Sequence, residues 1–137
     1  MGRRPRTSPC QPPSGWQALR RQLLADIDIV CAEPKRVEWD VQRGRALEAM
    51  AEVLLQQGTY LNAADIADAA AEVQVFREAP RRVAIAACLR DGEIPKAHMR
   101  FRYYEVLLGQ ELGVSPSPVI PSVLKAWALA PCQAGAR

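Results

Sequence analysis

Two stretches with the same residue pattern, QGTYLNA at residues 57–63 and DGEIPKA at residues 91–97, lie 34 residues apart. In each, a glycine (Gly58 or Gly92) is followed five positions later by an alanine. Such a glycine ends a helix, because it tolerates the left-handed backbone of a helix terminus. The alanine then falls in the next helix, where its small side chain allows close packing. The two stretches therefore predict a helix–turn–helix hairpin that occurs twice.

Helical periodicity on both sides of each glycine supports this prediction. Apolar residues recur at spacings of three or four, or at multiples of these, as on a helix buried on one side. The four stripes are, in chain order, Val37, Val41, Leu47, Ala51, Leu54 and Leu55; Leu61, Ala64, Ala67, Ala70 and Val73; Val83, Ala84, Ala87 and Cys88; and Ala97, Phe101, Tyr104, Leu108 and Leu112. They predict helices at about 34–57, 61–74, 80–90 and 95–111.

The predicted fold class is all-α, with about two tetratricopeptide (TPR)-like antiparallel hairpins and short flanking helices. A period of 34 residues is that of TPR arrays. The chain of 137 residues has room for one domain, and its alanine-rich composition with few aromatic residues favours helices over strands.

Four segments are expected along the chain. Residues 1–13 are rich in proline and arginine and predict a disordered tail. Residues 14–36 predict a short helix at about 15–25 followed by a linker. The TPR-like domain is expected at 37–130 and includes a last short helix at 121–129. The end, 131–137, is expected to fray.

The net charge of +3 is accounted for by Arg3, Arg4 and Arg6, so the rest of the chain is close to neutral. This balance argues against a dedicated nucleic-acid surface. Six further arginines on consecutive predicted helices could still gather in space: Arg77, Arg81, Arg82, Arg90, Arg100 and Arg102. Alternatively, they form a solvated face paired with Glu78, Asp91, Glu93 and Glu105. The candidate interaction face consists of Arg77, Arg81, Arg100 and Arg102. It also includes Tyr103, because this residue lies off the apolar stripe.

The residues needed for catalysis or metal binding are sparse. The four cysteines, Cys10, Cys31, Cys88 and Cys132, are far apart, and His98 is the only histidine. These spacings predict no zinc site and no nucleophilic triad, and the chain has no glycine-rich phosphate loop. We therefore expect no enzyme activity, cofactor, metal or small-molecule substrate. Without an apolar signal or membrane span, a soluble cytoplasmic protein with a reduced Cys88 is expected.

Several short motifs resemble a known family. They are RALEAMA at 45–51, RE at 77–78, LRDG at 89–92, KA at 96–97, FRYYE at 101–105 and, most specifically, QELGVSPSP at 110–118. Together they resemble the bacterial transcriptional activator domain, the TPR-like helical domain of regulators of the Streptomyces antibiotic regulatory protein type. The resemblance covers roughly 85 residues from about Val37, given the length of two repeats and the closing motif.

The resemblance implies a role in self-association and in coupling to other parts of a regulator. In that family a winged-helix DNA-binding domain normally precedes the helical domain, but the region before Val37 is too short and proline-rich for one. DNA contact is therefore expected to be indirect only. One departure lies at residues 74–78, QVFRE, where the family usually has an acidic residue and a proline. Without this proline, a less stiff junction between the hairpins is expected.

The leading hypothesis is a non-enzymatic protein-interaction module of a bacterial transcriptional regulator, which binds itself as a homodimer or binds another regulator. The residues that carry the structural motif are Gly58, Tyr60, Ala63, Gly92, Ala97, Tyr104, Glu111, Leu112, Gly113, Pro116 and Pro118. The first alternative is direct nucleic-acid binding through the arginine tail and helix faces. The second is a truncated regulator fragment with no role of its own.

Overall fold

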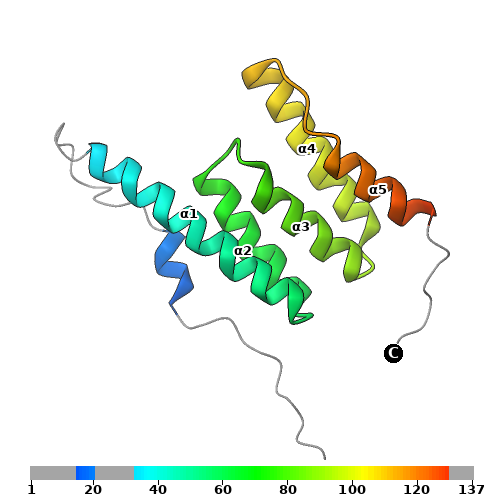
Figure 1. The fold of residues 1–137 in the computed structure, drawn as a ribbon, viewed down its shortest axis with the longest axis horizontal. Coiled ribbons are helices and arrows are strands. Elements are labelled where there is room, and N and C mark those ends of the chain that lie inside the picture. Colours follow the sequence, from blue (N-terminus) through cyan, green and yellow to red (C-terminus); the bar gives the residue numbers. More distant parts are fainter. Residues whose placement is uncertain (1–14, 21–32, 130–137) are drawn as a thin grey trace, which may run out of the picture.

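The computed structural model describes residues 15–20 and 33–129, and these residues form helices without any strand (Figure 1). The elements are a 3-10 helix η1 (Trp16–Arg20) and the α-helices α1 (Glu33–Gln56), α2 (Tyr60–Val73), α3 (Glu78–Arg90), α4 (Ile94–Leu112) and α5 (Val119–Leu129). The all-α class is confirmed, and the helix bounds lie within a few residues of those predicted. The predicted tails at 1–13 and 131–137, and part of the predicted first helix, lie outside the described residues.

The helices form two hairpins, α1 with α2 and α3 with α4, and α5 runs along α4 (Figure 1). Gly58 and Gly92 both have φ of 82°. Their turns close with equivalent backbone hydrogen bonds, which are Gly58 N to Leu55 O (3.3 Å), Thr59 N to Leu54 O (3.0 Å), Gly92 N to Leu89 O (3.2 Å) and Glu93 N to Cys88 O (2.8 Å). This is the paired bonding of a helix that ends in a left-handed glycine. The 34-residue repeat is therefore present in the backbone geometry itself.

The core consists of two clusters that share α3. The first joins α1, α2 and α3, and the second joins α3, α4 and α5. Seven residues of α2 are buried, and six of them are alanine: Ala63, Ala64, Ala67, Ala69, Ala70 and Ala71. Such small side chains allow α1 and α3 to pack closely against α2 on two sides. Ala97 is likewise fully buried at the start of α4.

Three residues predicted for the core are exposed instead. Val37 is 55% exposed, Leu61 67% and Leu112 51%. Val37 and Leu112 lie on the apolar sides of their helices but near the ends, where the neighbouring helices no longer cover them. Val37, for example, lies in the first two turns of α1, which extend past α2 (Figure 1). Leu61 instead lies on the solvent side of α2, in line with the exposed Asp65 and Glu72, so its place in the predicted apolar stripe was wrong. A stripe at every third residue drifts around a helix that has 3.6 residues per turn.

The N-terminal end of the array is covered by η1. Trp16 and Leu19 pack against the first cluster. Arg43, which is only 7% exposed, donates from Nη1 to the backbone oxygen of Leu19 (2.9 Å) and from Nε to Asp40 (2.8 Å). A buried arginine that is bonded to a backbone carbonyl and a carboxylate is satisfied, so this end of the domain is closed by specific contacts.

The turn glycines allow a matched stability test. At Gly58 and Gly92 an added Cβ has room, so the cost of alanine comes from the left-handed backbone alone. We expect Gly58→Ala and Gly92→Ala each to lower the free energy of unfolding by about 1–2 kcal/mol. Gly109→Ala, at an open position inside α4, should raise it by up to about 1 kcal/mol. Urea denaturation measures all three, and equal values for Gly92→Ala and Gly109→Ala would contradict the assignment.

Candidate protein-interaction surfaces

Arg81 of α3 is held between two aromatic rings of α4. Its guanidinium carbon lies 5.4 Å from the ring centre of Tyr103 and 5.3 Å from that of Tyr104. Its Nη2 also donates to the backbone oxygen of Val75 (3.4 Å). These cation–π contacts fix the arginine at the surface, with one exposed ring on one side and one buried ring on the other.

Arg100 of α4 forms an ion pair with Asp68 of α2. Burial by itself would lower the pKa of Arg100, but the hydrogen bond and the charge of Asp68 outweigh it and raise that pKa. The guanidinium therefore stays charged and links the second helices of the two hairpins. Beside this pair, α2 and α4 enclose a hollow of about 580 Å³ that is lined by Arg81, Arg100 and Tyr103.

The structure thus brings three of the five candidate face residues together and leaves two apart. Arg77 binds Glu48 of α1 (2.7 Å), and Arg102 binds Glu105 (2.8 Å); neither lines the hollow. Of the acidic partners expected for the arginines, only Glu105 forms such a pair in the described part of the chain. Of the six arginines, Arg77, Arg100 and Arg102 therefore pair with three different carboxylates.

The outer side of α4 carries a second apolar stripe. Met99 is 71% exposed, Tyr103 62% and Val106 53%. Their spacing of four and three residues puts them on one side of the helix, opposite the buried Tyr104 and Leu108. Helix α4 is therefore apolar both toward the core and toward solvent. Met99 and Tyr103 also line the hollow beside Arg81, so the stripe and the hollow form one surface, which we call the α4 face.

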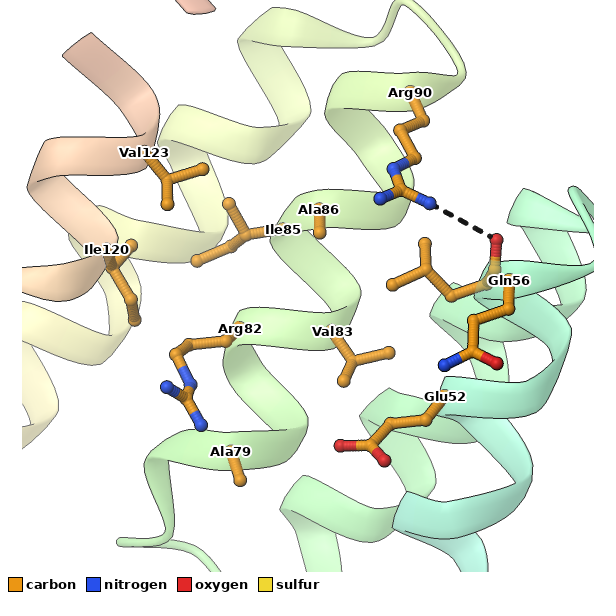
Figure 2. A pocket seen from close by; sticks show the side chains of 11 residues that line it. Glu52, Gln56, Ala79, Arg82, Val83, Ile85, Ala86, Arg90, Ile120 and Val123 are labelled. Carbon is orange, nitrogen blue, oxygen red and sulfur yellow. Dashed lines mark hydrogen bonds between the residues drawn. The ribbon is translucent and has the colours of Figure 1, made fainter. Parts of the chain in front are cut away.

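A groove of about 450 Å³ lies between α1 and α5, with α3 as its floor (Figure 2). Glu52 and Gln56 border it on the α1 side, and Val123 borders it on the α5 side (Figure 2). Arg82 lines the floor near α5, and Arg90 donates to the backbone oxygen of Leu55 (3.5 Å). From the sequence, Arg82 and Arg90 were considered only as surface arginines, and Leu55 and Val83 only as core residues. The groove itself was not predicted, because it forms only when α5 packs beside α3.

The motif at residues 110–118 forms the end of α4 and the linker to α5. Gly113 has φ of 65° and ends α4, with Val114 N donating to Leu108 O (3.4 Å). Further along, the backbone N–H of Ser117 donates to Glu78 (3.1 Å), and its hydroxyl bonds to the same carboxylate. These bonds fasten the linker to the first residue of α3 and so position α5.

The other motif residues have different roles. Tyr60 packs partly against the first cluster, Pro116 is half-buried, and Glu111 and Pro118 are exposed. The pair of Ser117 and Glu78 was missed from the sequence. Both residues lie within recognised motifs, but their 39-residue separation gives no sign that they meet.

The model of the bacterial transcriptional activator domain matches residues 16–126, from η1 into α5. The chain belongs to this family. No curated protein and no solved structure matches the chain. The family is a domain of transcriptional regulators and is not a known enzyme family. The matched residues extend beyond the motifs at 45–118 on both sides and include the η1 segment that covers α1.

Among the described residues, no helix combines the length and apolar character that crossing a membrane requires. The same residues contain no group of three or more histidine, cysteine, aspartate or glutamate side chains that could hold a metal ion.

The junction between the hairpins is bonded by three side chains. The hydroxyl of Tyr104 donates to the backbone oxygen of Phe76 (3.0 Å), Arg81 bonds Val75, and Arg77 bonds Glu48. Tyr104 itself is only 2% exposed. Its pKa is raised mainly by burial and further by the charge of Glu78, while Arg81 opposes the rise. The lower stiffness expected for this junction stays a prediction.

The raised pKa of Tyr104 leads to a pH dependence. A folded-state pKa above the ordinary 10.0 means that the protonated phenol stabilises the fold, and that this stability is lost as pH rises through the folded pKa. Tyr104→Phe should lower the free energy of unfolding by about 1 kcal/mol at neutral pH, through loss of one hydrogen bond. It should also lose less stability in alkali than the unmodified chain. Urea titrations on either side of pH 10.0 test this, with Tyr103→Phe as the exposed control; equal alkaline losses for the Tyr104 variant and the unmodified chain would contradict it.

The bonds of Ser117 are expected to hold α5 in place. Ser117→Ala removes the hydroxyl bond to Glu78, so amide exchange in α5 should become faster while exchange in α1 and α2 stays the same. Ser115→Ala is the matched control, because Ser115 is exposed in the same linker. Hydrogen–deuterium exchange followed by mass spectrometry distinguishes the two, and equal protection of α5 in both variants would show that Ser117 does not hold the helix.

Proposed function

We propose that this domain is a non-enzymatic protein-interaction module of a transcriptional regulator and that it self-associates through the α4 face. The observation that carries the proposal is the exposed stripe of Met99, Tyr103 and Val106. A helix on the surface of a monomer normally has a polar outer side. Three large apolar side chains in line on the outer side instead favour a surface that a partner covers.

A second copy of the chain fits this stripe well. In a two-fold dimer the same patch occurs on both partners, so each must be complementary to itself. Met99 and Val106 lie at similar distances on either side of Tyr103, and an antiparallel pair of α4 helices would therefore place apolar residues opposite apolar residues. The rings of Tyr103 would meet near the axis, and aromatic residues are enriched at such positions. The adjoining hollow adds contact area beyond the stripe.

Direct reading of DNA is not favoured by the described surface. Arg77, Arg100 and Arg102 each form an ion pair with a carboxylate. An arginine already paired in this way contributes less to phosphate binding than a free one, because its partner must first be displaced. We therefore propose that the domain acts in the cytoplasm by protein contact, with DNA contact only through other parts of a regulator, and that it catalyses no reaction.

The stripe can be tested by one charge at its end. Val106→Glu places a carboxylate in the proposed dimer contact, opposite the apolar Met99 of the second copy, so an unpaired charge would be buried there and the dimer should dissociate. Val53→Glu is the matched control, because Val53 on α1 is 51% exposed and Val106 is 53% exposed. Sedimentation velocity over a range of concentrations should show a dimer for the unmodified chain and for Val53→Glu, but a monomer for Val106→Glu.

Circular dichroism shows whether both variants keep their helices. A strict monomer of the unmodified chain at the highest concentration would overturn self-association. A folded Val106→Glu variant that still dimerises would move the contact away from the α4 face.

A further inference from the structure

We propose that the groove between α1 and α5 binds an extended peptide of a protein partner, with an acidic side chain two positions from an apolar one. The inference rests on the proposed role as a protein-interaction module, but not on self-association. The groove is formed by α1, α3 and α5, whereas the α4 face is formed mainly by α2 and α4. The two surfaces can therefore be tested separately.

The size of the groove suits a short peptide. Its floor extends along α3 from Ala79 to Arg90, which at 1.5 Å per residue is about 16 Å. An extended chain of about five residues covers this length. Small side chains, Ala79 and Ala86, form part of the floor, so the backbone of a peptide can approach α3 closely (Figure 2).

The two sides of the groove differ in chemistry. On the α1 side, Glu52 and Gln56 present oxygen atoms that can accept hydrogen bonds from a peptide backbone (Figure 2). On the α5 side, Val123, which is 37% exposed, presents apolar surface above the buried Ile120. In an extended peptide successive side chains point to opposite sides, roughly perpendicular to the backbone N–H and C=O groups. A backbone that bonds toward α1 therefore points every second side chain toward the α3 floor, where it can contact Val123 of α5.

Arg82 sets the charge of the preferred peptide. It is exposed on the α5 side of the groove, and in the described part of the chain it has no hydrogen bond or ion pair. The lining contains Arg82, Arg90 and one acidic residue, Glu52, so its net charge is positive. A carboxylate on the peptide can form a bidentate pair with Arg82, which a neutral side chain cannot.

The spacing of the two contacts gives the order of residues. Ile85, beside which Val123 lies in Figure 2, is three positions along α3 from Arg82, a rise of about 4.5 Å. Side chains on one side of an extended peptide are about 6.6 Å apart, which the length of the arginine side chain accommodates. An acidic residue, any residue and an apolar residue, in either chain direction, would thus meet Arg82 and Val123.

The test is a selection from displayed random seven-residue peptides on the immobilised full chain. We expect enrichment of sequences with an acidic residue two positions from an apolar one. Fluorescence anisotropy with the most enriched peptide, labelled with fluorescein, then measures affinity. Arg82→Glu should weaken binding at least tenfold, and Ala86→Tyr, which fills the floor, should weaken it similarly. The matched controls are Arg45→Glu and Ala46→Tyr, exposed positions outside the groove.

Each outcome decides the proposal. No enriched peptide, enriched peptides without the acidic residue, or affinities unchanged by Arg82→Glu and Ala86→Tyr would overturn it. Sedimentation velocity on the same proteins separates the two proposals. Arg82→Glu should remain a dimer, and Val106→Glu should bind the peptide as a monomer. If the unmodified chain is a monomer that binds the peptide, the peptide groove is supported and self-association is overturned. If it is a dimer that binds no peptide, self-association is supported and the peptide groove is overturned.

Discussion

The close packing of α2 between α1 and α3 is the constraint on which the rest of the structure depends. Six of its seven buried residues are alanine, so the helix axes can approach closely on both sides. The hairpins are then held by many small contacts around the larger buried side chains of Leu47, Leu54 and Ile66. Replacement of such an alanine by a larger residue would force the helices apart, because a packed interior has no space for added atoms. The tight turns at Gly58 and Gly92 bring each pair of helices together in the required geometry.

The two ends of the helical array differ in how completely their apolar side chains are covered. At the N-terminal end, Trp16 and Leu19 cover the first cluster, and Arg43 bonds to the covering segment. At the other end, α5 buries Ile120 and Leu124 but leaves Trp127 40% exposed. A helical array buries each apolar face against the next helix, so its last helices have faces left uncovered. The outer stripe of α4 lies in this part of the molecule, whereas the groove extends across α3 from α1 to α5.

The sequence allowed the repeat to be predicted because its signals are local. A glycine in a left-handed turn and an apolar residue every third or fourth position are readable within a few residues of chain. The misplaced residues show the limit. Leu112 follows the period but is not reached by a neighbouring helix, whereas Leu61 lies on the solvent side of α2, because a strict spacing of three drifts around a helix of 3.6 residues per turn. The contacts of the candidate interaction face were still harder to predict from the sequence. Whether Arg81 would meet two tyrosines or a carboxylate depends on how α3 crosses α4, and the contact of Ser117 with Glu78 spans 39 residues. Contacts of this kind follow from packing, and no local pattern encodes them.

Helix α3 contributes consecutive arginines to the two proposed surfaces. Arg81 lies against the rings of the α4 face, and Arg82 lines the groove. Neighbouring residues on a helix point about 100° apart, so one helix can serve both surfaces without making them overlap. A dimer formed through α4 would then leave the groove of each copy open and would present two peptide sites at a fixed separation. Two linked sites bind a partner with two matching segments more tightly than either site alone, because the second contact becomes intramolecular. Self-association of this domain would therefore strengthen the recruitment of a repeated or dimeric partner, even though no contact in the groove changes.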